Sequence, residues 1–130
     1  MYKKKKILLV ARERINELDI SSTLNELGYK VNSIVDNDKD VVKKCSIEKP
    51  NLVLIDIDLD KGRSSINIAK TILKKFKIPV VFLNVSQHEM LHNSKWLKQP
   101  VSFLTRPNDP LELQAAIEMA FLDKAFFMTN

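Results

Sequence analysis

The sequence predicts an α/β fold in which a parallel sheet carries helices on both of its faces. Apolar runs of strand length alternate with helical segments along the chain. The runs KILLV (6–10) and LVLID (52–56) are almost continuously apolar, which is typical of strands buried on both faces. The length of 130 residues fits one domain, and no repeat or internal linker divides it.

Five strand–helix units are expected, and turn or capping residues separate them. Gly28 ends the first helix, and Asn37 or Asp38 begins the second as its N-cap. Pro50 ends the connection after the second helix, while Asp109 and Pro110 supply the N-cap and first position of the last helix. The expected strands are 6–10, 29–35, 52–56, 80–84 and 101–105, and the expected helices are 14–27, 37–48, 65–76, a segment within 87–97, and 110–122.

Three of the expected helices carry an apolar stripe that should face the sheet. The spacing of three or four residues between the apolar positions places them on one side of each helix. The inward residues are expected to be Ile20, Leu24 and Leu27, then Val41, Val42 and Cys45, and then Ile68, Ala69 and Ile72.

Composition excludes several classes of protein. The single Cys45 rules out a disulfide framework, and its place on an apolar stripe makes it a small core residue rather than a reactive thiol. No apolar run reaches the length of a membrane span, and the N-terminal segment turns polar before a signal peptide can form. We therefore expect a cytoplasmic protein without a membrane segment.

The net charge of +5 raises the alternative of a basic nucleic-acid-binding module. Such a module needs basic residues gathered on one face, with aromatic residues between them. Lys3 to Lys6 form one basic run at the N-terminus, and the other lysines are scattered over several segments. Nucleic acid is therefore an unfavoured partner.

The stretch LVLIDIDLDKG (52–62) places Asp56, Asp58 and Asp60 at alternate positions. An EF-hand calcium loop begins in this way, but it requires glycine at its sixth position and glutamate at its twelfth. Those positions hold Lys61 and Asn67, so the calcium reading fails. Asp56 is the first polar residue after LVLI (52–55) and ends the expected strand. It is therefore expected at the carboxyl edge of the sheet, where open parallel sheets bind ligands.

The ordered set of strand ends resembles the receiver domain of two-component response regulators over residues 6–122. LVLIDIDL resembles the strand that carries the phosphoacceptor aspartate, which corresponds to Asp56. IPVVFLN resembles the strand that ends in threonine or serine, a position held here by Asn84. SFLTRPND resembles the segment with a switch aromatic and a Lys-Pro pair, which correspond to Phe103, Arg106 and Pro107. The resemblance implies a flavodoxin-like (βα)5 fold, a doubly wound five-stranded parallel sheet in the order 2-1-3-4-5.

The chain departs from the family pattern where the family holds Mg²⁺. The resemblance implies an acidic pair after the first strand, and this sequence has Ala11 and Arg12 there. Asp56 and Asp58 remain as carboxylates of that region, yet an octahedral Mg²⁺ site needs more than one suitably placed carboxylate. We therefore expect Mg²⁺ binding to be lost or weak, and no other cofactor is expected.

Two functional hypotheses follow from the resemblance. In the first, the chain is an atypical or pseudo-receiver that acts as a protein-interaction module, with Asp56 paired to Arg12, Arg106 or both. Arg12 pointing into solvent, with nothing replacing the metal, is the alternative to that ion pair. In the second, the chain is a conventional receiver that accepts a phosphoryl group on Asp56 from a histidine kinase. Neither hypothesis makes the chain an enzyme.

Partner and domain expectations also rest on the resemblance. Residues 1–123 are expected to form the receiver domain, and 124–130 a tail or the start of a linker. Expected partners are a histidine kinase or an output domain. A homodimer through helix 4, strand 5 and helix 5 is a further expectation, with Trp96, Phe103 and Pro107 as its switch or interface residues.

Overall fold

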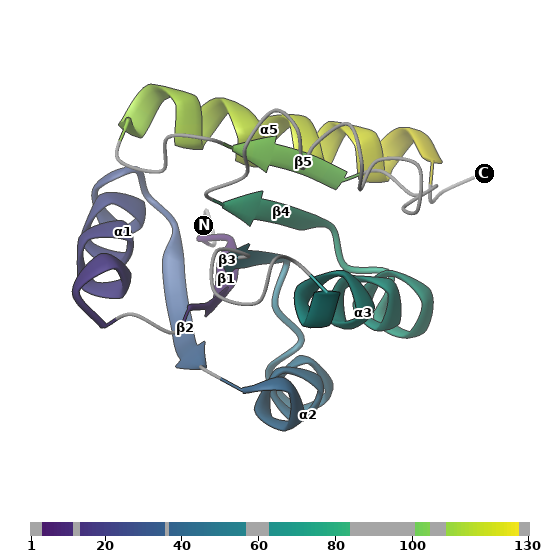
Figure 1. Ribbon diagram of the computed structural model, residues 1–130. Coiled ribbons are helices and arrows are strands. Elements are labelled where there is room, and N and C mark those ends of the chain that lie inside the picture. The colour runs from purple at the N-terminus through teal and green to yellow at the C-terminus, as the bar shows by residue number, and fades with distance from the viewer. Residues whose placement is uncertain are drawn as a thin grey trace.

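The computed structural model describes the backbone of residues 4–11, 14–35, 37–56, 63–83, 101–104 and 109–127. These segments form a parallel sheet flanked by helices (Figure 1). Its five strands lie in the order β2-β1-β3-β4-β5, and every neighbouring pair is parallel. The strands are β1 Lys6–Val10, β2 Lys30–Val35, β3 Leu52–Asp56, β4 Val80–Leu83 and β5 Val101–Leu104. The expected fold class and strand order are thereby confirmed.

Helices cover both faces of this sheet. The described helices are α1 Arg14–Glu26, α2 Asp38–Glu48, α3 Arg63–Thr71 and α5 Pro110–Phe127, with a π-helical segment, η1 Ile72–Phe76, following α3 directly. The helix expected within 87–97 lies outside the described residues. None of the helices that the structure describes has the length and apolar character needed to cross a membrane.

The alternation of side chains along each strand divides the core into two apolar clusters. Leu8 and Val10 of β1 face the cluster shared with α2 and α3, whereas Ile7 and Leu9 face the cluster shared with α1 and α5. Because both faces are covered, β1, β3 and β4 are apolar and buried at nearly every position, as expected of such strands, whereas the edge strand β2 is mostly half-buried or exposed. Of the predicted inward helical residues, Leu27 and Val42 are half-buried and the others are buried.

Capping residues explain where α2 begins and where α1 ends. Asn37 has extended backbone angles, and its side-chain Oδ1 accepts a hydrogen bond of 3.0 Å from the Asp40 backbone N–H. This is the N-cap arrangement, which satisfies one of the otherwise unpaired N–H groups at a helix start. Gly28 has a φ of +95°, a conformation that glycine adopts at low cost after a helix. Both capping predictions are confirmed.

The third predicted helix differs from the expectation in its start and in its last turn. A single α-helix was predicted over 65–76, but α3 starts at Arg63 and the turn Ile72–Phe76 is π-helical. The π-helical segment ends at Lys77, which has left-handed backbone angles. Such wide turns are uncommon and frequently occur at functional sites.

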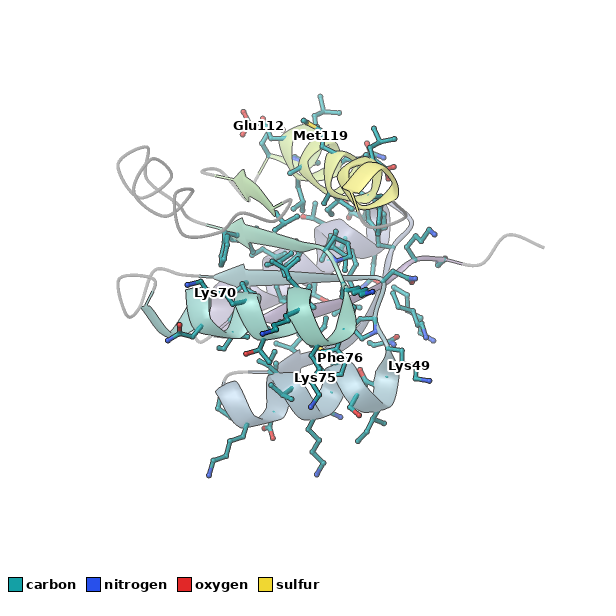
Figure 2. All side chains as sticks on the ribbon, turned by 90° about the vertical axis from the view of Figure 1, so that its right-hand side faces the viewer. Lys49, Lys70, Lys75, Phe76, Glu112 and Met119 are labelled. Atoms are coloured by element: carbon teal, nitrogen blue, oxygen red, sulfur yellow. The ribbon has the colours of Figure 1, made fainter. Side chains whose placement is uncertain are left out.

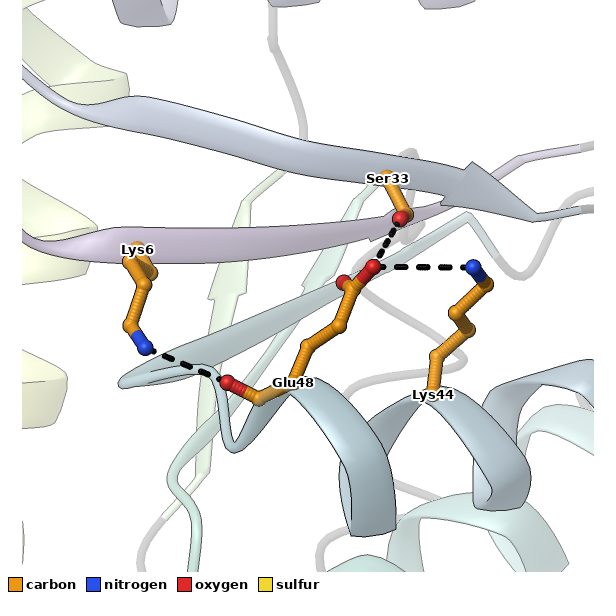
Figure 3. Close-up of polar contacts among 4 residues, drawn as sticks. All are labelled: Lys6, Ser33, Lys44 and Glu48. Carbon is orange, nitrogen blue, oxygen red and sulfur yellow. Dashed lines mark hydrogen bonds and ion pairs between the residues drawn. The ribbon is translucent and has the colours of Figure 1, made fainter.

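Glu48, at the end of α2, links that helix to two strands (Figure 3). Its Oε1 accepts a hydrogen bond of 2.7 Å from Ser33 Oγ of β2 and lies 3.5 Å from Lys44 Nζ. Its backbone oxygen accepts a bond of 3.2 Å from Lys6 Nζ of β1. Glu48 therefore ties the end of α2 to β1 and β2.

Candidate functional site

The carboxyl edge of the sheet gathers the strand ends on which the predicted site depends. Asp56 is the last residue of β3 and lies opposite Leu83, the last residue of β4. Leu83 in turn lies opposite Leu104, the last residue of β5. The chain passes from these strands directly to Asn84 and Thr105, so the strands that lead to the predicted residues end at one edge.

Asp56 reaches this edge because four buried residues precede it. Leu52, Val53, Leu54 and Ile55 are fully buried in the two apolar clusters. A carboxylate at any of these positions would be deprived of water, whereas the strand end gives access to solvent. The structure describes the backbone of Asp56, and this position agrees with the prediction that it is the first polar residue beyond the buried strand.

Ala11 follows β1 at the same edge and lies inside the protein. Its side chain is 1% exposed and belongs to the apolar cluster beneath α1 and α5. Its backbone N–H donates a hydrogen bond of 3.0 Å to the Val35 carbonyl oxygen, which extends the pairing of β1 with β2. Position 11 therefore supplies packing and a backbone bond, and its methyl group has no atom that can bind a metal.

The other predicted site residues lie outside what the structure describes, wholly or in their side chains. For Phe103 the backbone is described, in β5 opposite Phe82 of β4. The residues outside the described segments are Arg12, Asp58, Asn84, Trp96, Arg106 and Pro107. Their predicted roles stay predictions.

A Mg²⁺ site can be tested only against the described part of this edge. Among the described residues, no group of three His, Cys, Asp or Glu side chains is arranged to hold a metal ion. Ala11 occupies the place where the family has the first acid of its pair, and it has no donor atom. The lost or weak Mg²⁺ binding stays a prediction, because Arg12, Asp58 and the Asp56 side chain lie outside what the structure describes.

Sequence reasoning missed a pocket at the opposite edge of the sheet. This pocket, of about 500 Å³, lies between the end of α2 and η1, and its lining includes Cys45, Lys49, Lys75 and Phe76. Burial, and to a smaller extent the nearby Glu48 carboxylate, raises the pKa of the Cys45 thiol to about 11. The signal available in the sequence was the presence of lysines shortly before the starts of several strands.

The fold and the strand-end aspartate agree with the expected receiver-domain architecture. The signal receiver domain of a modulated diguanylate cyclase from Desulfovibrio desulfuricans superposes with a TM-score of 0.81 at 24% identity, covering 95% of this chain and 98% of that one. At this identity the likeness shows the fold alone. No protein-family model matches the chain.

Sequence relatives extend the likeness beyond the fold. The phyllosphere-induced regulator PhyR of Methylorubrum extorquens is 28% identical over 115 residues, which are 88% of this chain and 42% of PhyR. The transcriptional regulatory protein CrdR of Helicobacter pylori is 29% identical over 121 residues, or 92% of this chain and 56% of CrdR. The chain thus spans about half the length of these curated relatives. In fold and in sequence the chain is thus similar to receiver-domain response regulators, which is consistent with a signal-transduction receiver domain.

Proposed function

We propose that the chain is an atypical receiver domain that works as a protein-interaction module without Mg²⁺-dependent phosphotransfer. One observation carries the proposal: Ala11, at the end of β1, is buried among apolar side chains and offers no metal ligand. In the family that the chain resembles, carboxylates at this strand end hold the Mg²⁺ that neutralises the transferring phosphoryl group. Without them, the transfer to Asp56 loses its main electrostatic support.

In this proposal, arginine takes the place of the metal. Arg12 follows Ala11 in the chain, and Arg106 stands where the family has lysine. A guanidinium is permanently charged and binds carboxylates in a bidentate manner. An ion pair between Asp56 and either arginine keeps the carboxylate ionised and fills the space that a phosphoryl group needs.

Phosphorylation by a small donor tests this proposal directly. The chain is incubated with acetyl phosphate and Mg²⁺ and then weighed intact by mass spectrometry. We expect no phosphoryl adduct on the natural sequence. The Arg12→Asp variant removes the guanidinium and adds a carboxylate, so it should bind Mg²⁺ more tightly in a calorimetric titration. The matched control is Arg12→Asn, which removes the charge without adding a ligand.

The alternative is a conventional receiver, and the position of Asp56 at the strand end favours it. If the natural chain gains one phosphoryl group, and the Asp56→Asn variant does not, this alternative replaces the pseudo-receiver proposal. Octahedral density beside Asp56 in crystals soaked with Mg²⁺ would contradict the blocked site in the same way.

The partners in this proposal are other signalling proteins, in the cytoplasm, with a histidine kinase or an output domain as the candidates. A homodimer through the helix 4, strand 5 and helix 5 face belongs to the same proposal. In support, α5 exposes Leu111, Met119 and Leu122 by 76%, 58% and 70% of their surface. Figure 2 shows Met119 on the side of α5 that faces away from the sheet.

A further inference from the structure

The amino edge of the sheet, opposite Asp56, is strongly basic. Because all five strands are parallel, every strand begins at this edge. β1 starts at Lys6, which lies opposite Lys30 at the start of β2. Lys5 precedes β1, and its backbone oxygen accepts a hydrogen bond of 2.9 Å from the Lys30 N–H. Lysines that are far apart in the sequence are therefore brought together by the strand order.

Two helix ends add further lysines to this edge. Lys49 follows α2, and Lys75 and Lys77 lie at the end of η1 and just beyond it; all three are exposed. Among the described side chains, the acids near this edge include Glu26, Glu48 and Glu118; Glu48 is engaged by Lys44 and Ser33, and Glu118 accepts a hydrogen bond from Tyr29 Oη. The edge consequently carries a net positive charge that its own acids leave largely unbalanced.

Two of these lysines hold an unfavourable backbone conformation. Lys49 and Lys77 have φ values of +48° and +55°, in the left-handed region where helices ordinarily end in glycine. A residue with a side chain costs roughly 1 kcal/mol more than glycine in that conformation. The chain thus keeps a cationic side chain at two positions where glycine is the low-cost residue.

The pocket of about 500 Å³ opens on this basic edge between α2 and η1. Phe76 and Ile78 contribute apolar lining, while Lys49 and Lys75 contribute ammonium groups. Lys75 Nζ lies 5.5 Å from the centre of the Phe76 ring. In Figure 2, Lys75 and Phe76 lie beside α2, and Lys49 lies at the end of that helix. The lining of the pocket thus combines apolar side chains with polar groups and cations.

The helix ends and the lysines determine where this pocket can accept negative charge. α2 and η1 both point their carboxyl ends, which are the negative ends of the helix dipoles, toward this region. An anion is therefore disfavoured between the helix ends and favoured at the lysines around them. An apolar side chain can pack inside the pocket against Phe76 and Ile78.

We propose that this edge binds an acidic protein segment that inserts one apolar side chain into the pocket between α2 and η1. Aspartate and glutamate residues on either side of that anchor pair with Lys49, Lys75 and the lysines at the strand starts. A nucleic-acid backbone or an anionic membrane would satisfy the charges, but neither presents a lone apolar side chain to a pocket of this size. The site lies at the edge of the sheet opposite Asp56.

A labelled peptide tests the proposal. The probe has one central phenylalanine flanked by aspartate and glutamate residues, and its binding is followed by fluorescence anisotropy. We expect binding that weakens as salt is added, because exposed charges are screened. Replacing the phenylalanine by alanine should weaken binding about tenfold, close to the 1.4 kcal/mol that a small apolar contact supplies. Amide shifts in the NMR spectrum of the natural chain should change in segments 45–51 and 75–78.

A charge-matched pair of variants separates the pocket from general attraction. Lys49→Asn with Lys75→Glu removes the pocket cations, and asparagine tolerates the left-handed conformation at position 49. Lys39→Asn with Lys70→Glu makes the same charge change on exposed lysines that do not line the pocket. We expect the first variant to bind about tenfold more weakly and the second to change little.

Three results would overturn the proposal. One is failure of the natural chain to bind the acidic peptide; another is equal weakening by both variants. The third is preferential binding of single-stranded oligothymidylate, or of vesicles containing phosphatidylserine, under the same conditions. Circular dichroism of both variants confirms that they are folded before binding is compared.

Discussion

The Cys45 thiol shows how burial controls the chemistry of a single residue. Cys45 is 1% exposed, and burial raises the pKa of its thiol from 9.0 to about 11. Only the thiolate reacts with iodoacetamide. We expect alkylation near neutral pH to be at least about a hundredfold slower in the folded chain than in urea, because two pKa units are two factors of ten. Equal rates in the two states, measured by mass spectrometry, would contradict this prediction.

A substitution at Glu48 provides a second test of what raises the pKa of the Cys45 thiol. Its carboxylate is the smaller cause of the raised Cys45 pKa, after burial. Glu48→Gln should therefore lower the pKa of the thiol while leaving it above 9.0. Because the folded-state pKa exceeds the unfolded one, the thiol's contribution to stability is complete below the unfolded value and is lost as the pH rises through the folded value. The variant should make this loss smaller and end it at lower pH, as urea unfolding across the alkaline range can measure. A Cys45→Ala chain, which lacks the thiol, is the control.

At the scale of an element, the start of α2 rests on one side chain. Asn37 Oδ1 accepts the Asp40 backbone N–H at 3.0 Å, and Asn37 Nδ2 donates to Asp40 Oδ2 at 2.8 Å. Asn37→Ala should lower the free energy of unfolding by about 1 kcal/mol, the usual cost of losing an N-cap. Asn37→Ser retains an acceptor and should lose much less. Urea denaturation measures both, and equal losses would show that the cap bond is not responsible.

The elements also show which local features the sequence could predict. The caps at Gly28 and Asn37 were predictable because their backbone conformations favour particular residue types. The π-helical turn Ile72–Phe76, which buries Ile72 and Leu73, was not predictable, because the same apolar spacing suits an α-helix. The residue types at helix ends therefore predict where a helix starts or stops more clearly than they predict whether a turn is α-helical or π-helical.

For the whole molecule, the parallel topology brings lysines that are far apart in the sequence together at the amino edge of the sheet. The carboxyl edge carries both signs of charge, with Asp40 and Glu112 but also Lys39 and Arg63 near helix starts. The position of the candidate site at the carboxyl edge was predictable, because the ends of parallel strands lie at one edge of the sheet regardless of the loop conformations. The lysines look scattered in the sequence. They lie close together only because of the strand order and because helix ends that are far apart in the chain reach the same edge. The orientations of Arg12 and Arg106 depend on connecting segments, for which strand and helix patterns give no rule.

The exposed stripe on α5 leads to a prediction about assembly. Leu111, Ala115, Met119 and Leu122 recur at intervals of three or four residues, so they share one side of the helix. An apolar stripe of this kind on the surface is typical of an interface. In the proposed homodimer the stripes of two chains pack together, so Met119→Glu should bury an unpaired charge and weaken the dimer by roughly tenfold or more. Sedimentation velocity at several concentrations measures the change.

The control is Ile47→Glu, at an apolar residue of α2 that is 67% exposed and belongs to the other side of the sheet. A chain that stays monomeric at every concentration, or dissociates equally in both variants, would exclude α5 as the dimer surface.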